Sequence, residues 1–166
     1  SGNYIQAKAD PASVYAMLRI ELATGGGLPT AKVLDVVRLE KDTSLPAFGT
    51  SPLGFRIRRL RFLSGVVAAV EEIWLDGHFA KEILASELSE SLYLFYRQKL
   101  GLWIARAQDS VGQGPLPDWA PQDFPHQPQT PLPLITRISW DANGQSVELS
   151  KTWYDPTNVR YVARLK

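Results

Sequence analysis

The stretch from Gly54 to Asp76 constrains the fold of this chain more than any other part of its sequence. Two runs of mostly apolar residues, 55–63 and 66–75, flank the dipeptide Ser64-Gly65. Runs of this kind around a short turn containing glycine are typical of a β-hairpin. The sequence therefore predicts two long antiparallel strands here.

Further strands are predicted along the rest of the chain, mostly with short connections between them. Runs rich in valine, isoleucine and leucine predict strands at 31–39, 103–111, 134–140, 146–154 and 158–165. A turn at 141–144 joins two of these strands into a second hairpin.

Two segments carry the signals of helices. Residues 11–23 begin with a proline and stop at three consecutive glycines, and residues 86–100 show apolar residues at helical spacing before Gly101. Strands outnumber helices, and the helices fall between hairpins. The expected fold class is therefore α+β, an antiparallel β-sheet with flanking helices.

The stretch from Gly112 to Pro133 contains seven prolines. Proline lacks a backbone N–H and fixes its own backbone angle, so regular structure is excluded through most of this stretch. The sequence predicts a long loop, or a lid that covers a pocket.

Composition narrows the class of protein. The 166 residues amount to about one domain, and 45% hydrophobic with 21% charged residues is usual for a soluble globular protein. No apolar run approaches the ~20 residues that span a bilayer. A net charge of +1 lacks the basic excess of a stand-alone DNA-binding domain. We expect a cytoplasmic protein with no membrane partner.

Few residues are candidates for metal binding or catalysis. The chain has no cysteine, and His78 and His126 lie far apart without acidic neighbours at ligand spacing, so we expect neither a metal nor a cofactor. No Ser/His/Asp order, phosphate-binding glycine loop or paired-histidine motif is present. We expect no catalytic residues and no enzyme.

The arginines of the first hairpin are the strongest anomaly. Alternation along a strand puts Arg59 and Arg61 on one face with Phe55, Ile57 and Leu63. Two guanidinium groups beside an apolar surface repel one another and lose hydration unless an anion or a carboxylate joins them. They are either ligand-binding groups or solvated arginines on a half-exposed sheet.

The length of the hairpin turn decides which glutamate meets these arginines. A two-residue turn brings Glu72 to their face, whereas a three-residue turn over 64–66 places Glu71 opposite Arg59. Such a pair either orients the arginine for a ligand or is a structural salt bridge.

Two other polar groups are candidates for a binding site. Residues 89–93 open the second predicted helix, where a serine such as Ser91 either holds an anion or simply caps the helix. On the later hairpin a polar stripe shares one strand face, facing either solvent or a pocket, and consists of Glu148, Ser150, Thr152 and Tyr154.

Several short motifs occur in a fixed order. They are Arg59-Leu60-Arg61, Gly65, Glu71-Glu72-Ile73-Trp74-Leu75, Ser91-Leu92-Tyr93, Gly101, Ile138 to Gly144, and Val147 to Tyr154. In this order and spacing they resemble the UTRA domain of HutC-type regulators in the GntR family of bacterial transcription factors. The resemblance covers roughly residues 31–166.

The resemblance implies a chorismate-lyase-like fold with a pocket for a small effector. Carried over motif by motif, the implied effector-binding residues are Arg59, Arg61, Glu71, Ser91, Glu148 and Tyr154. The same match favours the three-residue turn. Two features depart from the family pattern: Asp155-Pro156-Thr157 follows the tyrosine, and the proline-rich stretch replaces a short helical region.

The resemblance also implies an organisation. Residues 1–30 are expected to be a linker with a connector helix that follows a missing winged helix-turn-helix domain, and residues 31–166 an effector-binding and dimerisation domain. The expected partners are a small anionic metabolite, such as a sugar phosphate or a carboxylate, a second copy of the chain, and DNA through the missing domain alone.

Two other functions stay open at this point. One is a chorismate-lyase-like enzyme in which Arg59 and Arg61 bind carboxylates and Glu71 moves a proton, an analogy of fold only. The other is a dimerisation scaffold that binds no ligand.

Overall fold

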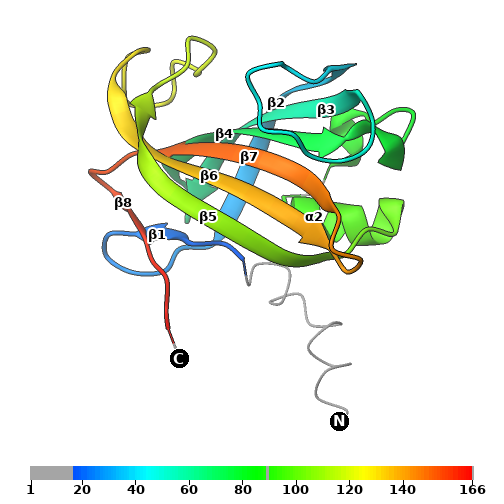
Figure 1. Cartoon of the computed structure of the whole chain (residues 1–166). Helices are drawn as coiled ribbons and strands as arrows, with labels where there is room; N and C mark the ends of the chain where they lie inside the picture. Colours follow the sequence, from blue (N-terminus) through cyan, green and yellow to red (C-terminus); the bar gives the residue numbers. More distant parts are fainter. Residues whose placement is uncertain (1–16, 89, 166) are drawn as a thin grey trace.

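The computed structural model describes residues 17–88 and 90–165. Its centre is a six-stranded antiparallel sheet with the strand order β2-β3-β4-β7-β6-β5 (Figure 1). The strands are β2 (Pro29–Glu40), β3 (Leu53–Leu63), β4 (Val66–Asp76), β5 (Ile104–Pro115), β6 (Pro131–Asp141) and β7 (Ser146–Tyr154). The predicted α+β class with an antiparallel sheet is confirmed.

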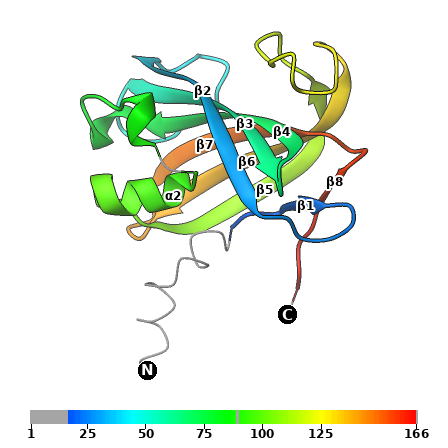
Figure 2. The same cartoon turned by 180° about the vertical axis from the view of Figure 1, so that it is seen from behind.

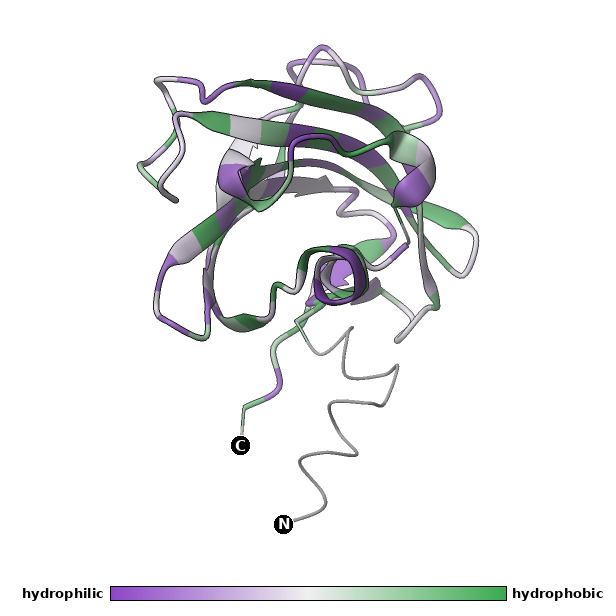
Figure 3. Cartoon of the chain, turned by 90° about the vertical axis from the view of Figure 1, so that its right-hand side faces the viewer, coloured by the Kyte–Doolittle hydropathy of each residue, from purple (hydrophilic) through white to green (hydrophobic). Residues whose placement is uncertain are grey.

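A short helical region fills the concave side of the sheet. It consists of η2 (Gly77–Phe79), η3 (Ala85–Glu87), α2 (Leu92–Phe95) and the π-helical turn η4 (Tyr96–Leu100). Figure 3 shows the sheet arching over this region. Phe95 and Tyr96 pack there against Ile57 and Leu75 of the sheet.

The predicted continuous helix over 86–100 is wrong in its first part. The helix begins at Leu92, because the Ser91 backbone is extended and its Oγ accepts a hydrogen bond of 3.2 Å from the Leu94 N–H. It ends at Gly101, as predicted, where the backbone turns left-handed with φ of 63°.

A second, two-stranded sheet joins the beginning and end of the described chain. β1 (Ile20–Leu22) pairs antiparallel with β8 (Val159–Tyr161) (Figure 2). The predicted helix over 11–23 is therefore wrong at 20–22, where pairing with β8 supplies the backbone hydrogen bonds, while residues 11–16 lie outside the described residues. The last predicted strand is shorter than 158–165.

The predicted first hairpin is confirmed, but its turn is not the three-residue turn. Leu63 faces Val66, and Ser64 and Gly65 both have positive φ, 48° and 77°, as in a type I′ turn. Arg59 nevertheless faces Glu71, because the register shifts by one residue where Ala68 is left unpaired. The β-bulge therefore produces the pairing of Arg59 with Glu71 that the three-residue turn was expected to produce.

The proline-rich stretch is a loop over 116–130 and is shorter than predicted. β5 and β6 extend into it and pair as far as Pro115 and Pro131. Two side chains of the loop, Leu116 and Phe124, are buried and pack against Leu60 and other residues on the convex side of the sheet. The loop is thus part of the hydrophobic core.

We therefore expect Phe124→Ala to lower the free energy of unfolding by about 3–5 kcal/mol, the usual loss for a buried phenylalanine. Urea denaturation followed by circular dichroism measures this change. The exposed Gln122→Ala serves as the matched control in the same loop. A loss below about 1 kcal/mol for Phe124→Ala would show that the loop is only loosely attached.

Candidate functional site

Polar side chains cross the concave face of the sheet, beside the helical region. In the strand registers, Arg59 of β3 faces Glu71 of β4, Glu71 faces Thr152 of β7, and Ser150 of β7 faces Arg137 of β6. These side chains line two adjoining cavities of about 90 Å³ and 70 Å³.

An arginine–glutamate–arginine cluster occupies one side of the first cavity. Glu71 Oε1 lies 3.1 Å from Arg59 Nη2 and 3.2 Å from Arg61 Nε, and all three residues are more than 90% buried. Arg59 Nη1 also donates to the Glu90 carbonyl at 3.1 Å. Burial alone would raise the pKa of Glu71, but Arg59 and Arg61 hold that pKa below its ordinary value. One ionised carboxylate is therefore shared by two guanidinium groups.

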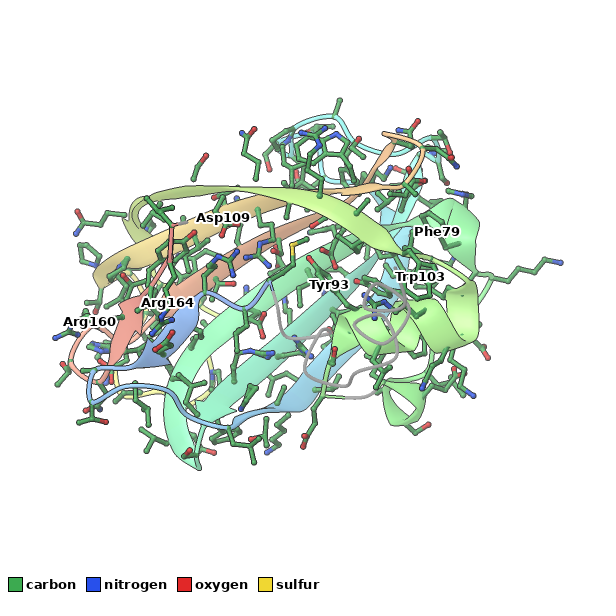
Figure 4. The ribbon with its side chains drawn as sticks, turned by 90° about the horizontal axis from the view of Figure 1, so that it is seen from below. Phe79, Tyr93, Trp103, Asp109, Arg160 and Arg164 are labelled. Atoms are coloured by element: carbon green, nitrogen blue, oxygen red, sulfur yellow. The ribbon has the colours of Figure 1, made fainter. Side chains whose placement is uncertain are left out.

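A second acidic group, Glu148, is surrounded by hydroxyls. Its Oε2 accepts from the Tyr96 hydroxyl at 2.5 Å, and its Oε1 accepts from Ser139 at 3.0 Å and from Tyr93 at 3.3 Å. Figure 4 shows Tyr93 on the concave side, between the sheet and the helical region. Burial raises the pKa of Glu148, and burial together with Glu148 raises the pKa of both tyrosines. The tyrosines thus remain hydroxyl donors.

A third cluster closes the other side of the cavities. Arg137 donates to Asp109 through Nε at 2.6 Å and through Nη2 at 3.0 Å, which is a two-point clamp. Arg137 Nη2 also donates to the Met17 carbonyl at 2.5 Å, and Tyr161 donates to Asp109 at 2.8 Å. Met17 and Leu18 line both cavities.

The structure gathers most of the predicted site residues in one place. The first cavity is lined by Arg59, Arg61, Glu71, Ser91 and Glu148. Tyr154 is not among its lining residues. It lies farther along β7, opposite Ala69, and packs in a hydrophobic cluster with Ile20 and Leu63.

Three further polar residues of the site, Arg137, Tyr96 and Ser139, were not predicted from the sequence. Arg137 sits two residues from Ser139 on one strand face, a spacing visible in the sequence. Their position beside the polar stripe of β7 follows from the predicted second hairpin, but only the pairing of β4 with β7 brings them to the face that carries Arg59 and Glu71.

The two departures from the family pattern contact each other on the other side of the sheet. Asp155 is 2% exposed and bonds to His126 of the proline-rich loop, with Oδ1 at 2.9 Å from Nε2. No residue of 112–133 lines either cavity. The lid interpretation of this stretch is therefore wrong.

Neither a metal site nor a membrane-spanning helix is seen among residues 17–88 and 90–165. No group of three or more histidine, cysteine, aspartate or glutamate side chains is arranged to hold a metal ion. No helix in these ranges is both long enough and apolar enough to cross a membrane.

Comparison with known proteins agrees with this architecture. The UTRA domain family model matches residues 25–160. The HTH-type transcriptional regulator SmoD of Agrobacterium fabrum is 53% identical over 166 residues, which is all of this chain and 71% of that protein.

Solved structures share the fold at low sequence identity. The ligand-binding domain of a GntR-family transcriptional regulator from Bordetella bronchiseptica superposes with a TM-score of 0.74 at 19% identity, covering 90% of this chain and 98% of that one. The effector domain of PhnF from Mycobacterium smegmatis gives 0.68 at 20% identity, covering 84% and 88%. Together with the match over 25–160, these findings show that the chain belongs to the UTRA domain family.

Proposed function

We propose that this domain senses a small anionic metabolite, and that binding in the concave cavities modulates operator binding by a winged helix-turn-helix domain of the full-length regulator. The observation that carries the proposal is the buried cluster in which Arg59 and Arg61 share the single carboxylate of Glu71.

The charges of this cluster favour an anionic ligand. Two guanidinium groups that are 3% and 6% exposed have lost most of their hydration, and both bind the same carboxylate oxygen of Glu71. Arg59 Nε has no hydrogen-bond partner among the described residues. A phosphate or carboxylate entering the cavity would supply a second negative charge and accept charge-assisted hydrogen bonds.

Transmission to DNA follows from the organisation of such regulators. A dimer of this domain would place two winged helix-turn-helix domains on operator half-sites, whose spacing decides binding. Ligand control then requires different ligand affinities for two arrangements of the dimer, with a coupling free energy of about 1–3 kcal/mol. The similarity to SmoD, which is named as a helix-turn-helix regulator, supports this organisation and a cytoplasmic location.

Within this site we assign Glu148 to positioning Tyr93 and not to contacting the ligand. Three hydroxyl groups, from Tyr93, Tyr96 and Ser139, already donate to its two oxygens. A carboxylate held this way fixes the direction of the Tyr93 hydroxyl, which lies at the lining of the cavity.

Anionic metabolites should stabilise the domain against heat. A ligand at 100 times its dissociation constant adds about 2.7 kcal/mol, which raises the Tm of a domain of this size by about 5–10 °C. A thermal-shift series with glucose 6-phosphate, glycerol 3-phosphate and small carboxylates, each beside its neutral parent compound, measures this. Shifts produced only by neutral or cationic compounds would refute the anion assignment.

Arg59→Ala and Arg61→Ala should each weaken binding of a stabilising anion by about 1.5–3 kcal/mol, as for a hydrogen bond to a charged group. Free-domain stability should change little, because Glu71 keeps one arginine in either variant. Calorimetry and urea denaturation measure both quantities, with the exposed Arg106→Ala as control. Loss of about 3–5 kcal/mol of stability at unchanged affinity would make the cluster purely structural.

Glu148→Gln should become more stable relative to the native chain as the pH rises from about 4 to about 8. A carboxyl whose folded-state pKa is raised favours the folded state while protonated and weakens it above the ordinary glutamate pKa of about 4.3. Glutamine lacks this loss. Urea denaturation at both pH values, with the exposed Glu82→Gln as control, measures the difference, and a constant or opposite difference contradicts it.

A further inference from the structure

We propose that the two adjoining cavities are two anion subsites, so that the ligand is a compact molecule with two separate anionic groups, the second of which is bound by Arg137. This inference rests on the proposed function and adds to it a ligand class and a binding arginine. Arg137 lies outside the motifs through which the sequence resembles the UTRA family.

The two cavities share one wall, and we call them the first and the second lobe of the site. Both are lined by Arg61, Glu71, Arg137 and Ser150, with Met17 and Leu18. The first lobe adds residues from β3, β7 and the helical region, namely Arg59, Ser91, Tyr93 and Glu148. The second lobe adds Arg19, Ile20, Ile135 and Thr152. Each lobe therefore has its own set of donors beside a shared wall.

The second lobe is built for negative charge. Arg19, Arg61 and Arg137 line it, and the one acidic residue in its wall is Glu71, which the first lobe also uses. The hydroxyls of Ser150 and Thr152 are further donors there. A carboxylate or phosphate group can accept from both kinds of donor.

Arg137 is held ready for such a group. Its Nε and Nη2 bind the two oxygens of Asp109, and the side chains of this pair are only 17% and 11% exposed. Although burial opposes it, the hydrogen bonds from Arg137 and Tyr161 keep the pKa of Asp109 low. The guanidinium group is thus fixed in direction, while its position in the wall of both lobes lets it contact a ligand group in either.

Selenate tests the two subsites directly, because it is a dianion whose selenium is located by anomalous diffraction. We expect crystals soaked in selenate to show one site beside Arg59 and a second beside Arg137. Selenate in the first lobe alone would overturn the second subsite and leave the anion-sensing function standing. Selenate in neither lobe would overturn both proposals.

Affinities in solution test whether one ligand uses both lobes. The probes are 3-phosphoglycerate and glycerol 3-phosphate. The first has a carboxylate where the second has a hydroxymethyl group. We expect the native chain to bind 3-phosphoglycerate at least about tenfold more tightly, the lower end for a hydrogen bond between charged groups. Arg137→Gln should reduce this preference to about twofold or less, whereas Arg59→Gln should weaken both probes alike.

Thr152→Val repeats the test without disturbing the Arg137–Asp109 clamp, and Arg106→Gln is the exposed control. We expect Thr152→Val to reduce the preference by about fivefold and Arg106→Gln to leave it unchanged. An equal affinity of the native chain for the two probes, or a preference unchanged in both lobe variants, would overturn the proposal. If neither probe binds, the selenate positions decide.

Discussion

The rest of the site depends on burying three charges together between β3 and β4. Glu71 is kept ionised by Arg59 and Arg61, and the arginines are kept folded inward by Glu71. Removing Glu71 would leave two buried guanidinium groups without their shared carboxylate, whereas removing either arginine leaves Glu71 paired with the other. Both guanidinium groups bind one carboxylate because two side chains on one strand meet a single glutamate on the next.

Strand register brings the cluster together, and one unpaired residue sets the register. With Ser64 and Gly65 in a two-residue turn, uninterrupted pairing would send Glu71 to the convex face. The bulge at Ala68 shifts the pairing by one residue, and Glu71 therefore lies on the same face as Arg59 and Arg61. Ala68 is fully buried, so the shift is built into the core next to Leu63.

Much of this could be predicted from the sequence, because local patterns carry it. Both hairpins, the helix stop at Gly101 and the shared face of Arg59 and Arg61 follow from alternation and turn residues. The strand β1 could not be predicted, because its partner β8 lies far away in the chain. The bulge could not be predicted either, because the alternation of the two hairpin strands does not show where one residue is left unpaired. Arg137 was missed because the pairing of β4 with β7, which joins the two hairpins and brings Arg137 to the cavity beside Glu71, does not follow from local patterns.

The hydrogen bond between Arg137 and Met17 connects the cavity wall to the backbone that precedes β1. Arg137 Nη2 bonds the Met17 carbonyl, and Met17 leads directly into β1, which is paired to β8. A guanidinium group that lines the cavity therefore also holds the backbone at Met17, three residues before β1. Because one side chain both lines the cavity and holds the Met17 carbonyl, a displacement of Arg137 by a bound molecule would also move the backbone that precedes β1.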